Sequence, residues 1–227
     1  MPNPTPDPEL LRSLGKLARG LSALFWGLPA ALIICAETAR VSLLESFEIV
    51  PALVVNALLL FGLWQMSSFQ KQERPWRNAL DRAKLLGLIN FGLCPFLFWF
   101  NRMPGQDYFK GAIVVLVISG LLFVFNLNVV LKQLGAMLPD ETLRHDINLF
   151  TALNRWMLTA WLFLVIAAVV IPNVGYFSKG QGLELLSWLG RAEAGILLFL
   201  GLAPLAITMA LIWKTKEIIF DSVFGAK

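Results

Sequence analysis

Amide and hydroxyl side chains interrupt several long apolar stretches of this 227-residue chain. A side-chain amide in hydrocarbon needs a hydrogen-bond partner, because leaving its polar groups unpaired costs several kcal/mol. Two interpretations are open: the side chains bond between helices and hold a bundle together, or they line a cytoplasm-facing cavity or a groove for another helix. The candidates, called the predicted polar seam, are Asn56, Asn90, Ser119, Asn126, Asn128 and Thr208.

Glu37 and Arg40 are the candidate interfacial charges. Arg40 follows Glu37 by three positions, so the two share one face of a helix if the helix continues that far. They are interpreted either as a charged end of a membrane span or as a contact for an ion or substrate. No acidic residue lies inside an apolar stretch. A pump with a carboxylate proton relay is therefore not expected.

The chain offers few groups for catalysis or cofactor binding. It has two cysteines and one histidine, which excludes a site built from two imidazoles of one chain. Cys35 and Cys94 lack the spacing of a zinc site, and no glycine-rich phosphate loop is present. We predict no enzymatic activity, no cofactor and no metal. The alternative is an enzyme acting on lipid through an interfacial cluster formed by Asp140, Glu141, His145 and Asp146.

The elements that position these residues follow from the segregation of charge. Hydrophobic residues make up 57% of the chain and charged residues 15%. A spanning helix needs roughly 20 apolar residues, and six runs approach that length. The predicted fold class is all-α, a polytopic helical integral membrane protein whose six transmembrane helices form three hairpins. The runs are residues 20–36, 49–66, 85–100, 111–131, 156–177 and 194–213.

The basic residues predict the orientation. With both termini in the cytoplasm, fourteen of the 19 Lys and Arg residues fall on the cytoplasmic side, as the positive-inside rule requires. This placement explains the basic character of the chain, so no nucleic-acid partner is predicted. Residues 1–8 are polar and proline-rich and do not resemble a signal peptide. We expect the first span to be retained, in a bacterial inner membrane.

Three regions are predicted along the chain. Residues 1–19 form a proline-rich cytoplasmic tail and an interfacial amphipathic helix, which begins at Pro8 after a cap at Asp7. Residues 20–213 form the six-helix transmembrane domain, and residues 214–227 a cytoplasmic tail. Residues 139–154 begin with a Pro-Asp start signal and continue without a breaker into the fifth run, so they are predicted to extend that span into the cytoplasm.

Two main classes of function are compatible with these features. The chain is predicted to be a non-catalytic anchor, scaffold or accessory subunit of a membrane complex. Its expected partners are membrane lipids and a protein partner or a second copy within the membrane. The alternative is a small-solute transporter or channel whose polar seam faces the cytoplasm. No motif is specific enough to name a family.

Overall fold

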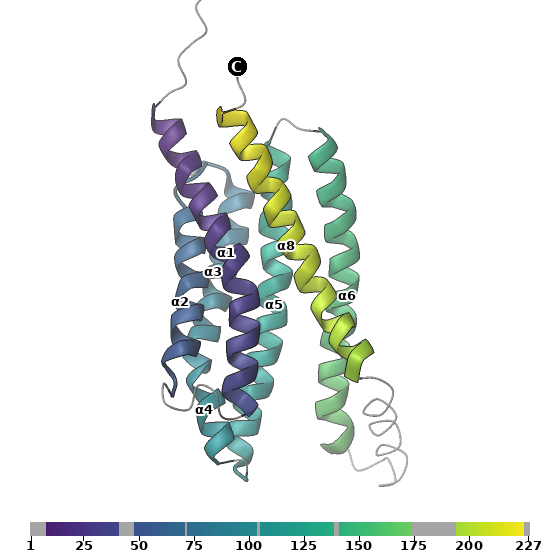
Figure 1. Cartoon of the computed structure of the whole chain (residues 1–227). Coiled ribbons are helices and arrows are strands. Elements are labelled where there is room, and N and C mark those ends of the chain that lie inside the picture. The colour runs from purple at the N-terminus through teal and green to yellow at the C-terminus, as the bar shows by residue number, and fades with distance from the viewer. Residues whose placement is uncertain are drawn as a thin grey trace, which may run out of the picture.

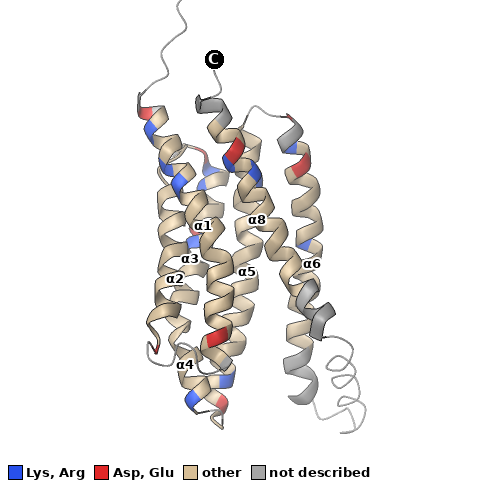
Figure 2. Ribbon diagram, in the orientation of Figure 1, with Lys and Arg blue, Asp and Glu red and all other residues tan. Residues whose placement is uncertain are grey.

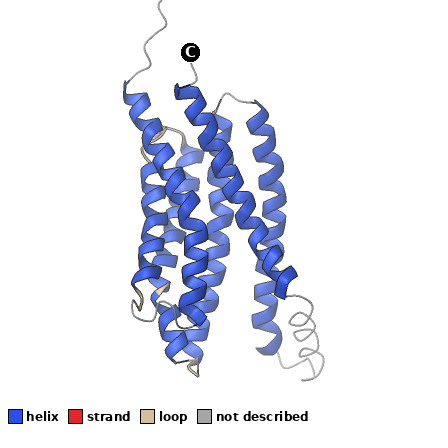
Figure 3. Ribbon diagram, in the orientation of Figure 1, coloured by secondary structure: helices blue, strands red, loops and turns tan. Residues whose placement is uncertain are grey.

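The computed structural model describes residues 8–40, 48–70, 72–103, 105–138, 141–173 and 194–224. Helices make up most of this part of the chain, which contains no strand (Figure 3). The all-α prediction is confirmed. The helices are α1 (Pro8–Arg40), α2 (Val50–Met66), α3 (Arg74–Leu93), α4 (Pro95–Arg102), α5 (Asp107–Met137), α6 (Glu141–Asn173) and α8 (Ala194–Phe224).

Within the described residues, four stretches of helix are long and apolar enough to cross a membrane. Their presence is consistent with an integral membrane protein. α2 is a shorter apolar helix of 17 residues. The predicted count of six spans is therefore not established, and residues 174–177 of the fifth predicted run lie outside the described residues. The four stretches are Leu11–Ala39, Arg74–Arg102, Asp107–Met137 and Arg144–Ala167.

The helices lie side by side in one elongated bundle (Figure 1). α1 packs against α2 and α8, α3 against α5, and α5 against α6. α1 begins and α8 ends at the same end of the bundle, which we call the terminal end (Figure 1). Lys and Arg residues gather towards the terminal end, while the middle of the bundle is almost free of charge (Figure 2).

Two predicted helix features are borne out by the helix bounds. α1 begins at Pro8, where a proline is favoured because the first N–H groups of a helix have no intrahelical partner; Asp7 lies outside the described residues. α1 then continues to Arg40, so the amphipathic segment and the first apolar run form one helix. α6 likewise begins at Glu141 and runs into the fifth apolar run without a break.

The main hydrophobic core lies towards the terminal end and joins all the long helices. α1 contributes Leu17, Leu21, Leu24 and Leu28, whose spacing of three or four residues places them on one helix face. Trp76 at the start of α3 is fully buried, and its indole Nε1 donates a hydrogen bond to the Phe69 carbonyl oxygen at 3.2 Å. This bond fixes the turn between α2 and α3.

α1 and α2 approach each other closely at two glycines. A Cβ atom added to Gly20 would lie 2.6 Å from the carbonyl oxygen of Gly62, and one added to Gly62 would lie 3.0 Å from the carbonyl oxygen of Gly20. Real Cβ atoms essentially never come as close as the first of these distances. Only residues without a side chain allow this backbone contact.

Candidate functional site

Three helices meet at a buried polar network formed by Asn128 of α5, Asn154 of α6 and Thr208 of α8. The Asn154 Nδ2 lies 3.1 Å from the Asn128 Oδ1 and 2.8 Å from the Thr208 Oγ1. The Asn128 Nδ2 donates to the Thr208 Oγ1 at 3.0 Å. Each pair of these helices is thus joined by at least one side-chain hydrogen bond.

Pro204 completes this network through its backbone. Its carbonyl oxygen accepts hydrogen bonds from the Asn154 Nδ2 at 3.0 Å and from the Thr208 hydroxyl at 2.7 Å. The two hydrogens of the Asn154 amide are therefore shared among three acceptors. The Asn154 Oδ1 is buried and accepts no hydrogen bond within the described part of the chain.

The network has the properties of a structural tie between helices. Its donors are paired across the helix interfaces, as polar groups in an apolar environment require. Interhelical bonds of this kind contribute about 0.6 kcal/mol each on average in membrane bundles. The network supplies no nucleophile beside a base, so it offers no acid–base chemistry.

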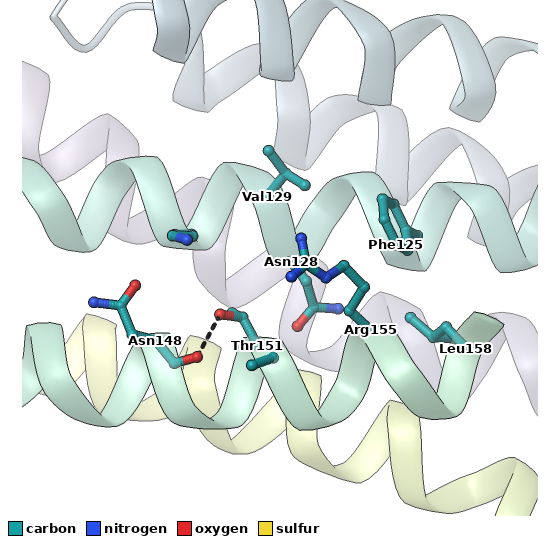
Figure 4. A pocket seen from close by; sticks show the side chains of 9 residues that line it. Phe125, Asn128, Val129, Asn148, Thr151, Arg155 and Leu158 are labelled. Atoms are coloured by element: carbon teal, nitrogen blue, oxygen red, sulfur yellow. Dashed lines mark hydrogen bonds between the residues drawn. The ribbon is translucent and has the colours of Figure 1, made fainter. Parts of the chain in front are cut away.

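A pocket lies beside this network, between α5 and α6 (Figure 4). Asn128 belongs to both and forms part of the pocket wall. Arg155 of α6 extends across the space between the two helices next to Asn128, and Asn148 and Thr151 lie further along α6 (Figure 4). Lys132 of α5 also lines the pocket, whose volume is about 50 Å³. Both helices contribute polar and apolar residues to its lining.

The other residues of the predicted polar seam do not join this network. The Asn56 Nδ2 donates to the Ala52 carbonyl oxygen at 2.8 Å and lies 3.9 Å from the Cys35 Sγ, so it acts between α1 and α2. The Asn126 Nδ2 donates to the Leu122 carbonyl oxygen of its own helix at 2.9 Å. The residues of the predicted polar seam therefore lie at several separate places in the bundle. Only Asn128 and Thr208 belong to the same network.

Asn90 and Ser119 form a third location, on the facing sides of α3 and α5. Both are buried, and neither the Asn90 Oδ1 nor the Ser119 Oγ has a hydrogen-bond partner among the described residues. A Cβ atom added to Gly87 would lie 3.4 Å from the Phe123 ring. Because the two helices run antiparallel, Asn90 and Ser119 each lie one turn beyond this contact, at a similar depth.

The charged candidates give a mixed result. α1 extends to Arg40, so Glu37 and Arg40 share a helix face, but the side chain of Arg40 lies outside the described residues and their pairing stays a prediction. In the proposed lipid-enzyme cluster, Asp146 forms an ion pair with Lys214 of α8. Asp140 is not described. No group of three or more potential metal ligands occurs among the residues that were described.

No family model, curated protein or solved structure matches this chain. Its function must therefore be inferred from its own contacts and charges.

Sequence reasoning missed Asn154, which makes three hydrogen bonds in the network. It lies in residues 139–154, which are predicted to extend the fifth span into the cytoplasm. A signal was present, since Ile147, Thr151, Asn154 and Leu158 recur at intervals of three or four residues. All four are buried. This face of α6 continues past Arg155 without interruption.

Proposed function

We propose that the chain is an integral membrane protein with six spans and cytoplasmic termini, acting as a non-catalytic anchor, scaffold or accessory subunit. The gathering of Lys and Arg at the terminal end supports this orientation (Figure 2). α8 supports the higher span count, because residues 194–213 contain no charge. α2 is the sixth proposed span, since its 17 residues form a helix about 25 Å long.

An exposed apolar stripe on α6 carries the scaffold proposal. Leu149, Leu153 and Trp156 are 60%, 51% and 75% exposed. Their spacing of four and three residues places them on one face, which points away from the bundle. We call this face the α6 stripe. Exposed apolar patches of this kind mark sites of interaction with proteins or membranes.

Leu149 and Leu153 form the part of the α6 stripe nearest the terminal end, and their height in the bundle favours a protein partner there. Leu149 and Leu153 lie between Asp146, which pairs with Lys214, and Arg155. In the proposed orientation this height corresponds to the lipid headgroups and the adjacent cytoplasm, where acyl chains do not cover apolar side chains. A helix of another protein, or of a second copy, would bury the stripe by packing along it.

Purification of the tagged full-length chain in mild detergent, at native expression level, tests this proposal. We expect mass spectrometry to find a partner in near-stoichiometric amount. Leu153→Glu places a charge in the stripe and is expected to remove that partner, because an unpaired carboxylate in an apolar contact is strongly unfavourable. Ala136→Glu is the matched control, since Ala136 is exposed at the same end of α5.

The control variant should keep the partner. If both variants retain the partner equally, the contact lies elsewhere on the chain and the α6 stripe does not bind the partner. Recovery of the wild-type chain alone, without a second copy, would contradict the scaffold function.

A second candidate is a small-solute transporter or channel. The buried oxygens of Asn90 and Ser119, which have no hydrogen-bond partner in the described part of the chain, favour it, because polar atoms within an apolar bundle can serve a hydrated solute. Asn90→Leu would then abolish uptake of labelled ions or small neutral solutes into liposomes, while the protein still accumulates and unfolds as the wild type does. Asn126→Leu, in the same bundle but bonded only to its own helix, is the control. Failure of Asn90→Leu to accumulate would instead support a structural role.

A further inference from the structure

Two cations face the pocket between α5 and α6 without a counter-charge. Lys132 and Arg155 line it from opposite helices, and no carboxylate is among the described residues of its wall. Neither cation takes part in the ion pairs of the described residues, which are Lys84–Asp81, Lys110–Asp107 and Lys214–Asp146. An anion in the pocket would relieve the repulsion between the two positive groups.

Two polar residues of the pocket wall are buried. Asn128 is 4% exposed and Thr151 is 8% exposed. The Asn128 amide is fixed by hydrogen bonds to the Val124 carbonyl oxygen and to the Thr208 hydroxyl, at 2.8 and 3.0 Å. The Thr151 hydroxyl is likewise held by the Ile147 carbonyl oxygen at 2.5 Å. These two residues of the wall are thus held in place before any ligand arrives, which reduces the entropy lost on binding.

The size and chemistry of the pocket select a phosphate group. Its volume of about 50 Å³ is well below the roughly 300–1,000 Å³ of pockets that enclose drug-sized ligands. A guanidinium binds two phosphate oxygens at once, and an ammonium adds a point charge. Asn148, exposed at the rim, offers an amide N–H as a further donor.

The height of the pocket places it beside lipid phosphates. Asn154 bonds to Asn128, so the adjoining Arg155 lies near the height of Leu127 on α5. Leu127 is separated from Lys110 by about 25 Å of helix, and α5 carries no charge in between. This distance approaches the thickness of the hydrocarbon core. Basic pockets between helices on the cytoplasmic side bind the head groups of anionic lipids.

The geometry points to this pocket as a binding site for a phosphate group, supplied by an anionic phospholipid of the cytoplasmic leaflet or by free phosphate. Lys132 and Arg155 hold the charge, and Asn148 and Thr151 flank it. The site goes beyond the scaffold function. The pocket and the α6 stripe lie on different sides of α6, so either proposal can fail without the other.

The test uses the full-length chain, freed of lipid in a non-ionic detergent. Native mass spectrometry measures binding of phosphatidylglycerol, with diacylglycerol of the same acyl chains as the phosphate-free comparison. Equilibrium dialysis with labelled inorganic phosphate forms the second arm. The variant is Lys132→Gln/Arg155→Gln. Its matched control, Arg77→Gln/Arg82→Gln, removes the same charge from two exposed positions on α3.

Binding of phosphatidylglycerol but not of diacylglycerol, weakened on the order of 30-fold in the pocket variant and unchanged in the control, supports the site and identifies lipid as the source. Binding of labelled phosphate with the same dependence on Lys132 and Arg155 supports the site with free phosphate as the source. An equal loss in both double variants would show only an effect of net charge and would overturn the proposal, as would absence of binding in both arms.

A second variant keeps the proposal testable if the double variant does not fold. Asn148→Asp adds a negative charge at the exposed rim and removes neither cation, so it should weaken phosphate binding by repulsion. Asn78→Asp, at an exposed position of α3, is its control. Unchanged binding by Asn148→Asp in a folded protein would also overturn the proposal.

Discussion

Gly20 of α1 and Gly62 of α2 face each other so closely that a Cβ atom on Gly20 would lie 2.6 Å from the Gly62 carbonyl oxygen. Both residues are buried, and Leu21 and Leu63 beside them belong to the main core. The backbone contact therefore fixes how the flanking leucines of α1 and α2 interdigitate. Small residues let membrane helices approach in this way.

Gly20→Ala is expected to destabilise the protein by about 1–3 kcal/mol, because the new methyl group must push the two backbones apart. Thermal unfolding in detergent, followed by tryptophan fluorescence, measures the change. Gly15→Ala is the control on the same helix, since a Cβ atom there meets nothing within 4 Å. Equal stability of the two variants would show that α1 and α2 do not pack as described.

Asn154→Leu is expected to destabilise the bundle by about 1–2 kcal/mol, since it removes the bonds that join α6 to α5 and α8. Denaturant titration in detergent gives the value. Asn126→Leu should have a smaller effect, because that amide bonds only within its own helix. A double-mutant cycle of Asn154→Leu with Thr208→Val should be non-additive, because the two side chains bond directly. Additive effects would argue against the network.

Trp76→Phe should lose about 1 kcal/mol of stability, because it removes the hydrogen bond to the Phe69 carbonyl oxygen and leaves that acceptor unpaired. Trp76→Ala should lose about 3–5 kcal/mol through the cavity it creates. Both can be measured by thermal unfolding with circular dichroism. Trp64→Phe is the control, since Trp64 is exposed on α2. A Trp76→Phe variant as stable as Trp64→Phe would contradict the assigned bond.

Asp146 and Lys214 join α6 to α8 through an ion pair between partly exposed side chains. Asp146→Lys and Lys214→Asp should each destabilise the protein, and the double exchange should recover much of the loss. The recovered part is expected to be about 0.5–1 kcal/mol and to shrink at high salt. Unfolding midpoints at low and high salt provide the measurement. No recovery in the double exchange would show that the two groups do not interact.

The helical fold was predictable because a long apolar run within a membrane can adopt few backbone structures other than a helix. Within hydrocarbon every backbone polar group must be paired, and a helix pairs them within one segment. The start at Pro8 and the continuous α6 followed from local signals, a favoured proline and an absence of breakers. Both depend on residues close together in the chain, which is why one sequence was sufficient.

The contents of the site could not be predicted in the same way. Asn128 and Thr208 were recognised as polar groups in apolar runs, but their partner Asn154 was placed outside the membrane. Gly20 and Gly62 carry no sequence signal that pairs them. Such contacts depend on the rotation and register of one helix against another. A similar depth in the bundle does not imply a shared face, and this is why Asn126 does not join Asn128.

The shortness of α2 has a consequence for the membrane around it. Its 17 residues extend about 25 Å, below the roughly 30 Å of an average hydrocarbon core, and Val50, Val54 and Phe61 are exposed on its outer side. Lipids next to α2 would have to shorten to match it, whereas those next to the longer α5 would not. In the proposed bilayer setting, hydrophobic mismatch on one side would favour thinner membrane regions and give the protein a preferred lipid neighbourhood.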